Sequence, residues 1–215
     1  DTLFTRTITS DIYSIVIGDD CIHTSDGGFA LVGEVSDSTN VYSDIILIKM
    51  DSAGNEDWRT FLGGSLDENP NSIIETPDKG FVVGCVQRHL GIQESADPVI
   101  FKTDSLGQEE WSLNLGGPSK DDKAMVCNTH DSCIMVLTAY ADSMYTYDYA
   151  YAKINLIKVD LNGDTVWNKK YGPSKPVNLV SNLIVLESGE VITSGWANHS
   201  TNLPAAGWIF KFSAD

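Results

Sequence analysis

Pairs of acidic residues stand in two of the links between the apolar segments of this chain. Asp67 and Glu68 form one pair, and Asp121 and Asp122 form the other. Carboxylate oxygens are the ligands that hard divalent cations prefer. A divalent cation held where these acidic loops converge is therefore one interpretation. A solvated acidic rim is the other, and the sequence favours it.

Tyrosines gather in one segment, "YADSMYTYDYAYAK". They are Tyr140, Tyr145, Tyr147, Tyr149 and Tyr151. Tyrosine combines a broad apolar face with a hydroxyl group, so an exposed cluster suits recognition of a protein or a glycan. The alternation also fits a long hairpin whose tyrosines pack across its own strands. Both interpretations stay open, and the five tyrosines join the two acidic pairs as candidate ligand-binding residues.

Lysines recur at matching places, at Lys49, Lys102, Lys158 and Lys211. A ring of cations for an anionic ligand is one interpretation. In three of the four places, however, the lysine stands two residues before a turn aspartate. This regularity favours a repeated structural bond.

Other chemical motifs are incomplete. Asp160, Asn162 and Asp164 resemble the opening of a calcium loop, but the glycine and the distant glutamate of such a loop are missing, which favours a satisfied turn. The four cysteines include no CxxC pair, and Cys127 and Cys133 bracket a turn, where a disulfide or two buried thiols would fit. No GxSxG, HExxH or phosphate-binding loop occurs. We therefore predict no catalytic residue, no metal site and no cofactor.

Charge and hydropathy narrow the classes of partner. The chain of 215 residues carries 14 basic and 30 acidic side chains, a net charge of -16. Nucleic acid and anionic membranes would repel such a chain. No stretch approaches the roughly 20 apolar residues of a transmembrane helix. We expect neither a nucleic-acid partner nor a transmembrane segment.

An internal repeat positions all these residues. Trp58, Trp111 and Trp167 stand 53 and 56 residues apart, and Phe4 stands 54 residues before Trp58. A second column, with "TSDGGFALVG" and "TPDKGFVVG", and the lysine column share this period. The approximate repeats are residues 1–54, 55–107, 108–163 and 164–215 of a single domain. Such a period is typical of repeat architectures.

Each unit is predicted to form four strands, named A to D. In the second unit these are "NSIIET", "GFVVGCV", "DPVIFKT" and "EEWSLNL". The segments are short, rich in β-branched and aromatic residues, and bounded by turn residues. Continuously apolar A, B and C strands indicate sheets covered on both faces, and the mixed D strand indicates the outermost position. The links from B to C and from D to A differ between units, so one edge should be variable and the other uniform.

Units of this kind predict an all-β fold, a β-propeller of four blades with four antiparallel strands each. The chain begins in a D strand and ends in a C strand, so residues 1–8 should complete the last blade and close the ring. The alternative is a part of a larger propeller.

The unit "DGGFALVGEVSDSTNVYSDIILIKMDSAGNEDWRTFLGG" resembles the repeats of secreted or surface-attached bacterial β-propeller proteins, of the quinoprotein-like or Kelch-like kind. Two units depart from the pattern, with "HDSC" in the third and Ser213 in place of the turn aspartate in the fourth. The resemblance implies the fold and a secreted or cell-surface location, and it carries over no catalytic residue.

These observations favour a non-catalytic, extracytoplasmic binding or scaffold module that recognises a protein or glycan through its variable loop face. A carbohydrate-active hydrolase or lyase, or an ancillary domain of a larger surface protein, is the alternative.

Overall fold

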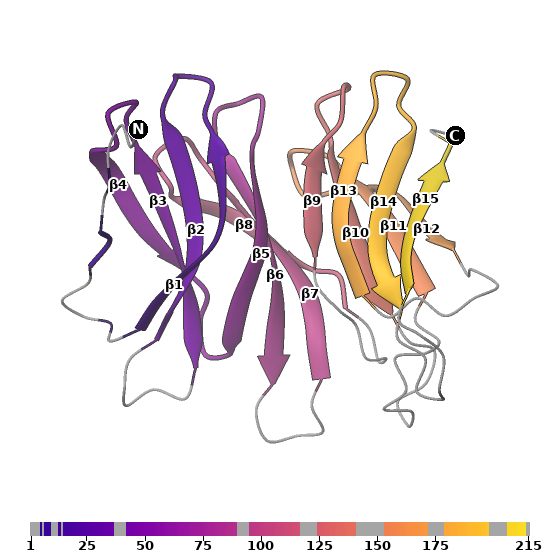
Figure 1. Ribbon diagram of the computed structural model, residues 1–215, viewed down its shortest axis with the longest axis horizontal. Coiled ribbons are helices and arrows are strands. Elements are labelled where there is room, and N and C mark those ends of the chain that lie inside the picture. Colours follow the sequence, from indigo (N-terminus) through magenta and orange to yellow (C-terminus); the bar gives the residue numbers. More distant parts are fainter. Residues whose placement is uncertain are drawn as a thin grey trace.

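The computed structural model describes fifteen strands in four antiparallel sheets. The described residues are 5, 7–9, 13, 15–36, 42–89, 95–116, 124–140, 153–171, 179–197 and 206–213. Sheets that follow one another in the sequence contact one another, and in Figure 1 the first two sheets lie to the left of the last two.

Strand bounds follow the predicted A to D pattern. The first sheet holds β1 (Ile15–His23), β2 (Phe29–Ser36), β3 (Ser43–Met50) and β4 (Glu56–Leu62). The second holds β5 (Asp67–Glu75), β6 (Phe81–His89), β7 (Ser95–Thr103) and β8 (Glu109–Asn114). The third holds β9 (Met125–Asn128), β10 (Ile134–Tyr140), β11 (Lys153–Val159) and β12 (Thr165–Tyr171). The fourth holds β13 (Leu179–Val185), β14 (Val191–Ala197) and β15 (Ala206–Phe212).

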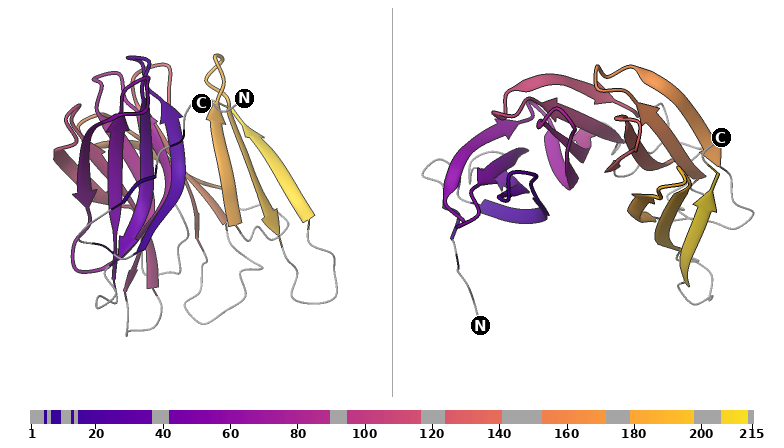
Figure 2. Two further views of the ribbon diagram at one scale, coloured as in Figure 1. Left: turned by 60° about the vertical axis from the view of Figure 1, so that its left-hand side comes forward. Right: turned by 90° about the horizontal axis from the view of Figure 1, so that it is seen from above.

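Every sheet is a meander in which each strand pairs with the next one in the sequence. Seen from above, the sheets form an arc (Figure 2). The inner strands β1, β5, β9 and β13 contact one another in that order and line the concave side. The D strands β4, β8 and β12 form the opposite edges of their sheets, as the sequence predicts.

Apolar side chains fill the spaces between neighbouring sheets. One cluster joins the first sheet to the second, with Leu47 and Phe81 among its buried residues. A second cluster joins Ile100 of the second sheet to Val136 of the third. A third joins Leu137 to Leu183 of the fourth sheet. The middle sheets are thus covered on both faces, which explains their continuously apolar strands.

Short hairpins of one repeated geometry form the uniform edge, at residues 24–28, 51–55, 76–80, 104–108, 129–133, 160–164 and 186–190. In the C to D hairpins, an aspartate closes its own turn: Asp160 Oδ1 accepts hydrogen bonds from the backbone N–H groups of Asn162 and Asp164, each at 2.9 Å. The predicted satisfied turn is confirmed there. Glycine fits at the left-handed position, for example Gly163 with φ of 89°.

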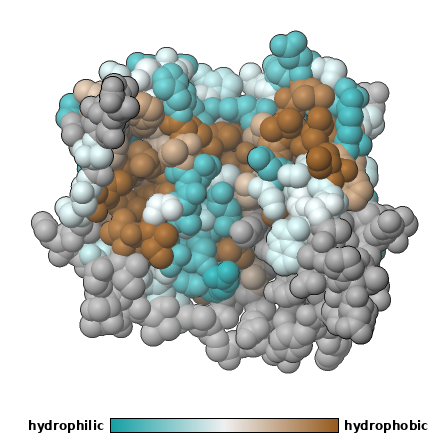
Figure 3. Space-filling model, in the orientation of Figure 1, coloured by the Kyte–Doolittle hydropathy of each residue, from teal (hydrophilic) through white to brown (hydrophobic). Residues whose placement is uncertain are grey.

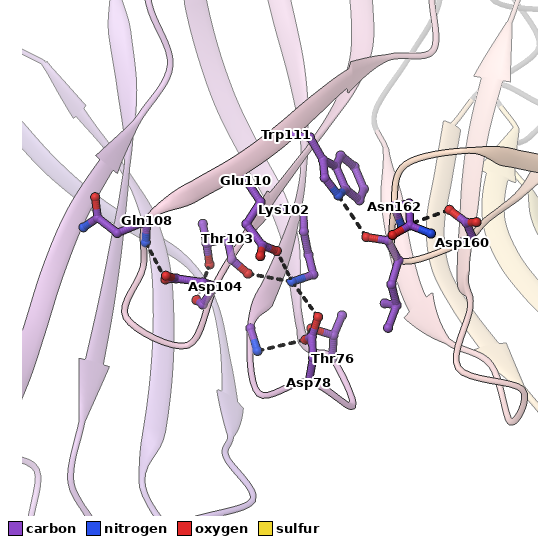
Figure 4. A network of polar contacts seen from close by, with 12 residues as sticks. Thr76, Asp78, Lys102, Thr103, Asp104, Gln108, Glu110, Trp111, Asp160 and Asn162 are labelled. Carbon is purple, nitrogen blue, oxygen red and sulfur yellow. Dashed lines mark hydrogen bonds and ion pairs between the residues drawn. The ribbon is translucent and has the colours of Figure 1, made fainter.

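The lysine column forms the structural bond that its spacing indicated, but the main partner is on a different hairpin. Lys102 is fully buried, and its Nζ lies 3.0 Å from Asp78 Oδ2, 2.7 Å from Glu110 Oε2 and 2.8 Å from the carbonyl oxygen of Thr103 (Figure 4). Lys49, Lys158 and Lys211 likewise meet the acidic residue of the A to B hairpin. These bonds fasten the A to B hairpin of each sheet to its C strand.

Two of the recurrent tryptophans, Trp58 and Trp111, join their sheet to the next. Trp111 Nε1 donates a 3.0 Å hydrogen bond to the carbonyl oxygen of Leu161, and its ring lies over Gly163 (Figure 4). Trp58 lies over Gly107 in the same way. A glycine is required because a side chain would occupy the space of the indole. In the second and third sheets, the recurring turn is therefore a docking seat for the tryptophan of the preceding sheet.

The two ends of the arc differ from its middle. The fourth sheet has three strands among the described residues, and Ile184 and Ile209 of this sheet are exposed. Ile8 packs on the outer face of the first sheet, near Ile46 and Ile48. Ile8 stands four residues after Phe4, as Leu62 and Leu115 stand four residues after Trp58 and Trp111. Leu62 packs on the second sheet and Leu115 on the third.

This position of Ile8 suits the predicted closing strand. Phe4 lies outside the described residues, and the pairing of residues 1–8 with β15 stays a prediction. The four cysteines are free thiols, so Cys127 and Cys133 do not form the hairpin disulfide. Burial raises the pKa of the Cys127 thiol.

Candidate functional site

A pocket of about 250 Å³ lies where the inner strands of all four sheets come together. It is lined by Asp19, Pro70, Asn71, Met125, Val180, Ser181 and Trp196. The concave face carries a hydrophilic band in its middle, between an apolar area over the first sheet and another over β13 and β14 (Figure 3). The pocket thus combines polar groups from several sheets with apolar walls.

β-Bulges put three of the polar residues into this pocket. The pairing register shifts by one residue between Gly18 and Asp20, between Pro70 and Ser72, and between Val180 and Asn182. The extra residues are Asp19, Asn71 and Ser181, each of which lines the pocket. A bulge re-aims the side chain of the residue that it inserts. Sheet three has no bulge in β9 and contributes Met125 instead.

The residue after the bulge ties two neighbouring sheets together. Asp20 Oδ2 accepts a 3.0 Å hydrogen bond from the backbone N–H of Ile73 in β5. One sheet further, Ser72 Oγ accepts a 3.0 Å hydrogen bond from the backbone N–H of Val126 in β9. These bonds fix the inner strands relative to one another. The bulges therefore both supply side chains to the pocket and help to hold its walls in place.

The carboxamide of Asn71 is only partly satisfied. Its Nδ2 donates a 2.9 Å hydrogen bond to the carbonyl oxygen of Pro70. Its Oδ1 is buried, and no described residue donates to it. A buried acceptor without a donor costs roughly 1–3 kcal/mol, and native proteins seldom leave one without a reason.

Trp196 supplies the aromatic wall of the pocket. It lies one residue before the end of β14, at the side of the variable edge, and 41% of its surface is exposed. The other four tryptophans are less exposed than this. An indole ring that remains accessible beside polar groups is a common feature of binding sites.

A second polar cluster lies at the variable edge between the first two sheets; we call Asp44, Asp67, Glu68, Gln87 and Arg88 the edge cluster. Glu68 is fully buried, and its Oε1 accepts a 2.8 Å hydrogen bond from Gln87 Nε2. Burial raises the pKa of Glu68 and that of Asp44. Both carboxylates come within 3.0 Å of the point that a Cβ on Gly63 would occupy, so a glycine at this position leaves room for them.

Asp67 has a different environment from its neighbour. Its Oδ1 accepts a 3.1 Å hydrogen bond from the backbone N–H of Ser43, and its Oδ2 lies 3.7 Å from Arg88 Nη1. Asp67 and Glu68 are thus held in a bonded cluster. The expected solvated acidic rim is wrong for Glu68, because β6 and the 63–66 link enclose its carboxylate.

The other predicted ligand-binding residues are only partly described. Tyr140 is the last residue of β10, is buried, and lies under the ammonium group of Lys170 at 4.2 Å from its ring centroid. Tyr145, Tyr147, Tyr149, Tyr151, Asp121 and Asp122 lie outside the described residues. Within the described ranges, no three histidine, cysteine or acidic side chains converge as metal ligands.

The pocket residues escaped the sequence analysis. Asp19, Asn71 and Ser181 each stand five residues before the first residue of an A to B hairpin, and this shared spacing was the signal that was present. Their residue types differ, so no motif marked them. The described residues include no helical segment with the length and apolarity that a bilayer crossing requires.

Comparison with solved structures supports the architecture. A GH43 β-1,3-galactosidase superposes with a TM-score of 0.54 at 9% identity, over 89% of this chain and 41% of that chain. The β-propeller domain of the trilobed protease from Pyrococcus furiosus, described as having an open velcro topology, superposes with a TM-score of 0.51 at 11% identity, over 94% of this chain and 56% of that chain.

This chain therefore spans about half the length of the structures that it matches. No model of a protein family matches the sequence, and no curated protein matches it significantly. At such low identity the likeness concerns the fold and not the activity. The four meander sheets, their tryptophan docking and these superpositions together identify the fold as a β-propeller whose sheets are its blades.

Proposed function

We propose that this propeller is an extracytoplasmic, non-catalytic recognition module that binds a glycan through its variable edge. The main support is that one edge of the propeller has a repeated structural role and the other edge varies between blades. On the uniform edge, the repeated lysines are paired with acidic residues, and Trp58 and Trp111 are docked. The variable edge differs from blade to blade, so it is the edge on which a specific surface can be built.

The described side chains of the variable edge suit hydroxyl groups. In the edge cluster, the half-exposed Arg88 offers a guanidinium group, and Asp44 and Asp67 offer partly exposed carboxylates. Glycans present many hydroxyls, each a donor and an acceptor. The net charge of -16 disfavours anionic polymers as partners and leaves neutral glycans unaffected. The predicted tyrosines would add apolar contact.

A glycan array probed with the labelled protein tests this proposal. We expect capture of a defined group of glycans, and weaker capture by a variant with Tyr145, Tyr147 and Tyr149 changed to serine. A variant with Leu106→Ala, on the opposite edge, is the control and should bind like the wild type. Binding of no glycan, with capture of a purified protein partner instead, would overturn the glycan assignment.

A carbohydrate-active hydrolase is a second candidate because of one observation. The carboxylates of Asp44 and Glu68 converge beside Gly63, and burial raises the pKa of both. Retaining glycosidases use two carboxyl groups about 5–5.5 Å apart, one of them a protonated acid. Release of nitrophenol from a panel of nitrophenyl glycosides, abolished by Glu68→Gln, would support this candidate. Equal rates with the variant would exclude Glu68 as the acid.

A further inference from the structure

The pocket between the inner strands has the marks of a built site. Three strands each carry one inserted residue, and all three inserted side chains line the same pocket. A bulge interrupts pairing and is kept where it re-aims a side chain. The same kind of bulge thus supplies Asp19, Asn71 and Ser181 from three different blades.

These side chains determine which groups a ligand must bring. The buried Oδ1 of Asn71 needs a donor, which no described residue provides. The carboxylate of Asp19 is an acceptor, and the hydroxyl of Ser181 can accept or donate. The ligand therefore carries at least one hydrogen-bond donor, which reaches the Asn71 carboxamide.

The walls determine the shape of the ligand. Trp196 presents a half-exposed indole, and Met125 and Val180 add apolar surface. A ligand that fits has an apolar face to lie on the ring and polar groups at its rim. Sites for whole drug-sized ligands measure roughly 300–1,000 Å³, whereas this pocket measures about 250 Å³. It has room for a small molecule or for one unit of a larger one.

We propose that this pocket binds a single pyranose unit, with one face of the sugar ring on Trp196 and a sugar hydroxyl donating to Asn71 Oδ1. The pyranose ring combines a C–H face with hydroxyl donors at its rim, as the pocket requires. The choice of a sugar as ligand rests on the function proposed above. The location of the site is independent of that function, because the pocket lies on the concave side and not in the edge cluster.

An organic ammonium ion is the competing ligand, since it would also donate hydrogen bonds and lie over an indole ring. The two differ in their response to salt. Binding of a cation by a chain of net charge -16 weakens as salt is added, whereas binding of a neutral sugar does not.

Saturation-transfer NMR and titration calorimetry with the methyl glycosides of glucose, galactose, mannose and N-acetylglucosamine test the proposal. We expect at least one to bind with a dissociation constant on the order of 1 mM, a value usual for a ligand of this size. Trp196→Ala and Asn71→Ala should each weaken binding about tenfold or more. Ile209→Ala, an exposed apolar change in the same blade, should leave it unchanged.

Stability measurements keep the test interpretable. Each variant is melted by circular dichroism, and a binding defect counts only if the protein is folded. Asn71→Leu removes the orphan acceptor and should melt no lower than Asn71→Ala while also failing to bind, because the acceptor serves the ligand and not the fold.

Three outcomes overturn the pocket assignment. The first is no glycoside binding up to about 50 mM, far above the expected constant. The second is binding that persists in Trp196→Ala; glycan-array capture would then place the sugar elsewhere and leave the proposed function standing. The third is tetramethylammonium binding that outcompetes the glycosides and falls with salt.

Discussion

The docking of Trp58 on Gly107 can be tested by adding one methyl group. In Gly107→Ala, the new Cβ would lie 2.5 Å from Cζ3 of the indole and 3.0 Å from two further ring atoms. Overpacking of this kind costs roughly 1–3 kcal/mol. Gly107 also has a φ of 79°, where an L-residue costs roughly 1–2 kcal/mol. We expect the free energy of unfolding to fall by about 2–5 kcal/mol in total.

Two other glycines separate these contributions. Gly27 has a φ of 88°, but a Cβ there would meet no atom within 4 Å. Gly27→Ala should therefore show only the backbone cost of about 1–2 kcal/mol. A Cβ on Gly163 would lie 3.2 Å from the Trp111 ring, so Gly163→Ala should fall between the two.

Urea unfolding followed by circular dichroism measures these differences, with the slope checked for constancy. For a chain of this size, each kcal/mol also lowers the melting temperature by about 2–4 °C. In a Trp58→Leu background the ring is absent, so Gly107→Ala should cost no more than Gly27→Ala does. Equal effects of Gly107→Ala with and without Trp58, or an effect no larger than that of Gly27→Ala, would refute the docking seat.

Three further predictions concern charged groups. Lys102→Met leaves two carboxylates without their partner and should lower the free energy of unfolding by about 1–3 kcal/mol; the loss is moderate because both carboxylates are partly solvated. Lys211 is 53% exposed, so Lys211→Met should lower it by at most about 1 kcal/mol. Urea unfolding measures both variants. Burial raises the pKa of Glu68 above its ordinary value of 4.5, so the charged form opposes folding. Glu68→Gln should then stabilise the protein at pH 7 and lose this advantage below pH 4.5, and a destabilised variant at pH 7 would contradict the assignment. The Lys158 bond lowers the pKa of Asp131 from 3.8 to about 2, so its stabilisation is present above pH 3.8 and disappears toward pH 2; acid titration of Asp131→Asn should lack this component.

The strands and their order were predictable because their signals repeat. Trp58 and Trp111 fixed the period, and turn aspartates such as Asp104 marked the hairpins. A β-meander pairs neighbouring strands, so their sequence order gives the order within each sheet. Covered faces produced the continuous apolar runs of β6 and β10.

Partners across the sheet were harder to predict. The position of Lys49, two residues before a turn aspartate, indicated a structural bond without identifying its acceptor. In the register of β2 and β3, Lys49 lies opposite Ala30, which brings its amine to Asp26 of the preceding hairpin. Asp51 instead accepts hydrogen bonds from its own turn. Spacing along the chain indicated a bond, but only the register identified its acceptor.

The pocket depends on features that have almost no signature in a single sequence. A bulge adds one residue to an inner strand, and the predicted strand "NSIIET" began at the inserted residue itself, Asn71, so no interruption of pairing was visible in it. β5 begins four residues earlier, at Asp67. The inserted residue is an aspartate, an asparagine or a serine, depending on the blade. That these residues line one pocket becomes apparent only in the structure, where the four inner strands surround one space.

The pairing of each strand with its successor also bears on how the protein is made. Among the described strands, the ladder hydrogen bonds of one sheet lie within about 50 consecutive residues, as in β5 to β8 between Asp67 and Asn114. A blade can therefore form its ladder soon after its last strand leaves the ribosome, without waiting for distant sequence. The tryptophan at the start of its D strand then stays uncovered until the next blade supplies a glycine seat, so each newly made sheet offers a surface on which the following one assembles.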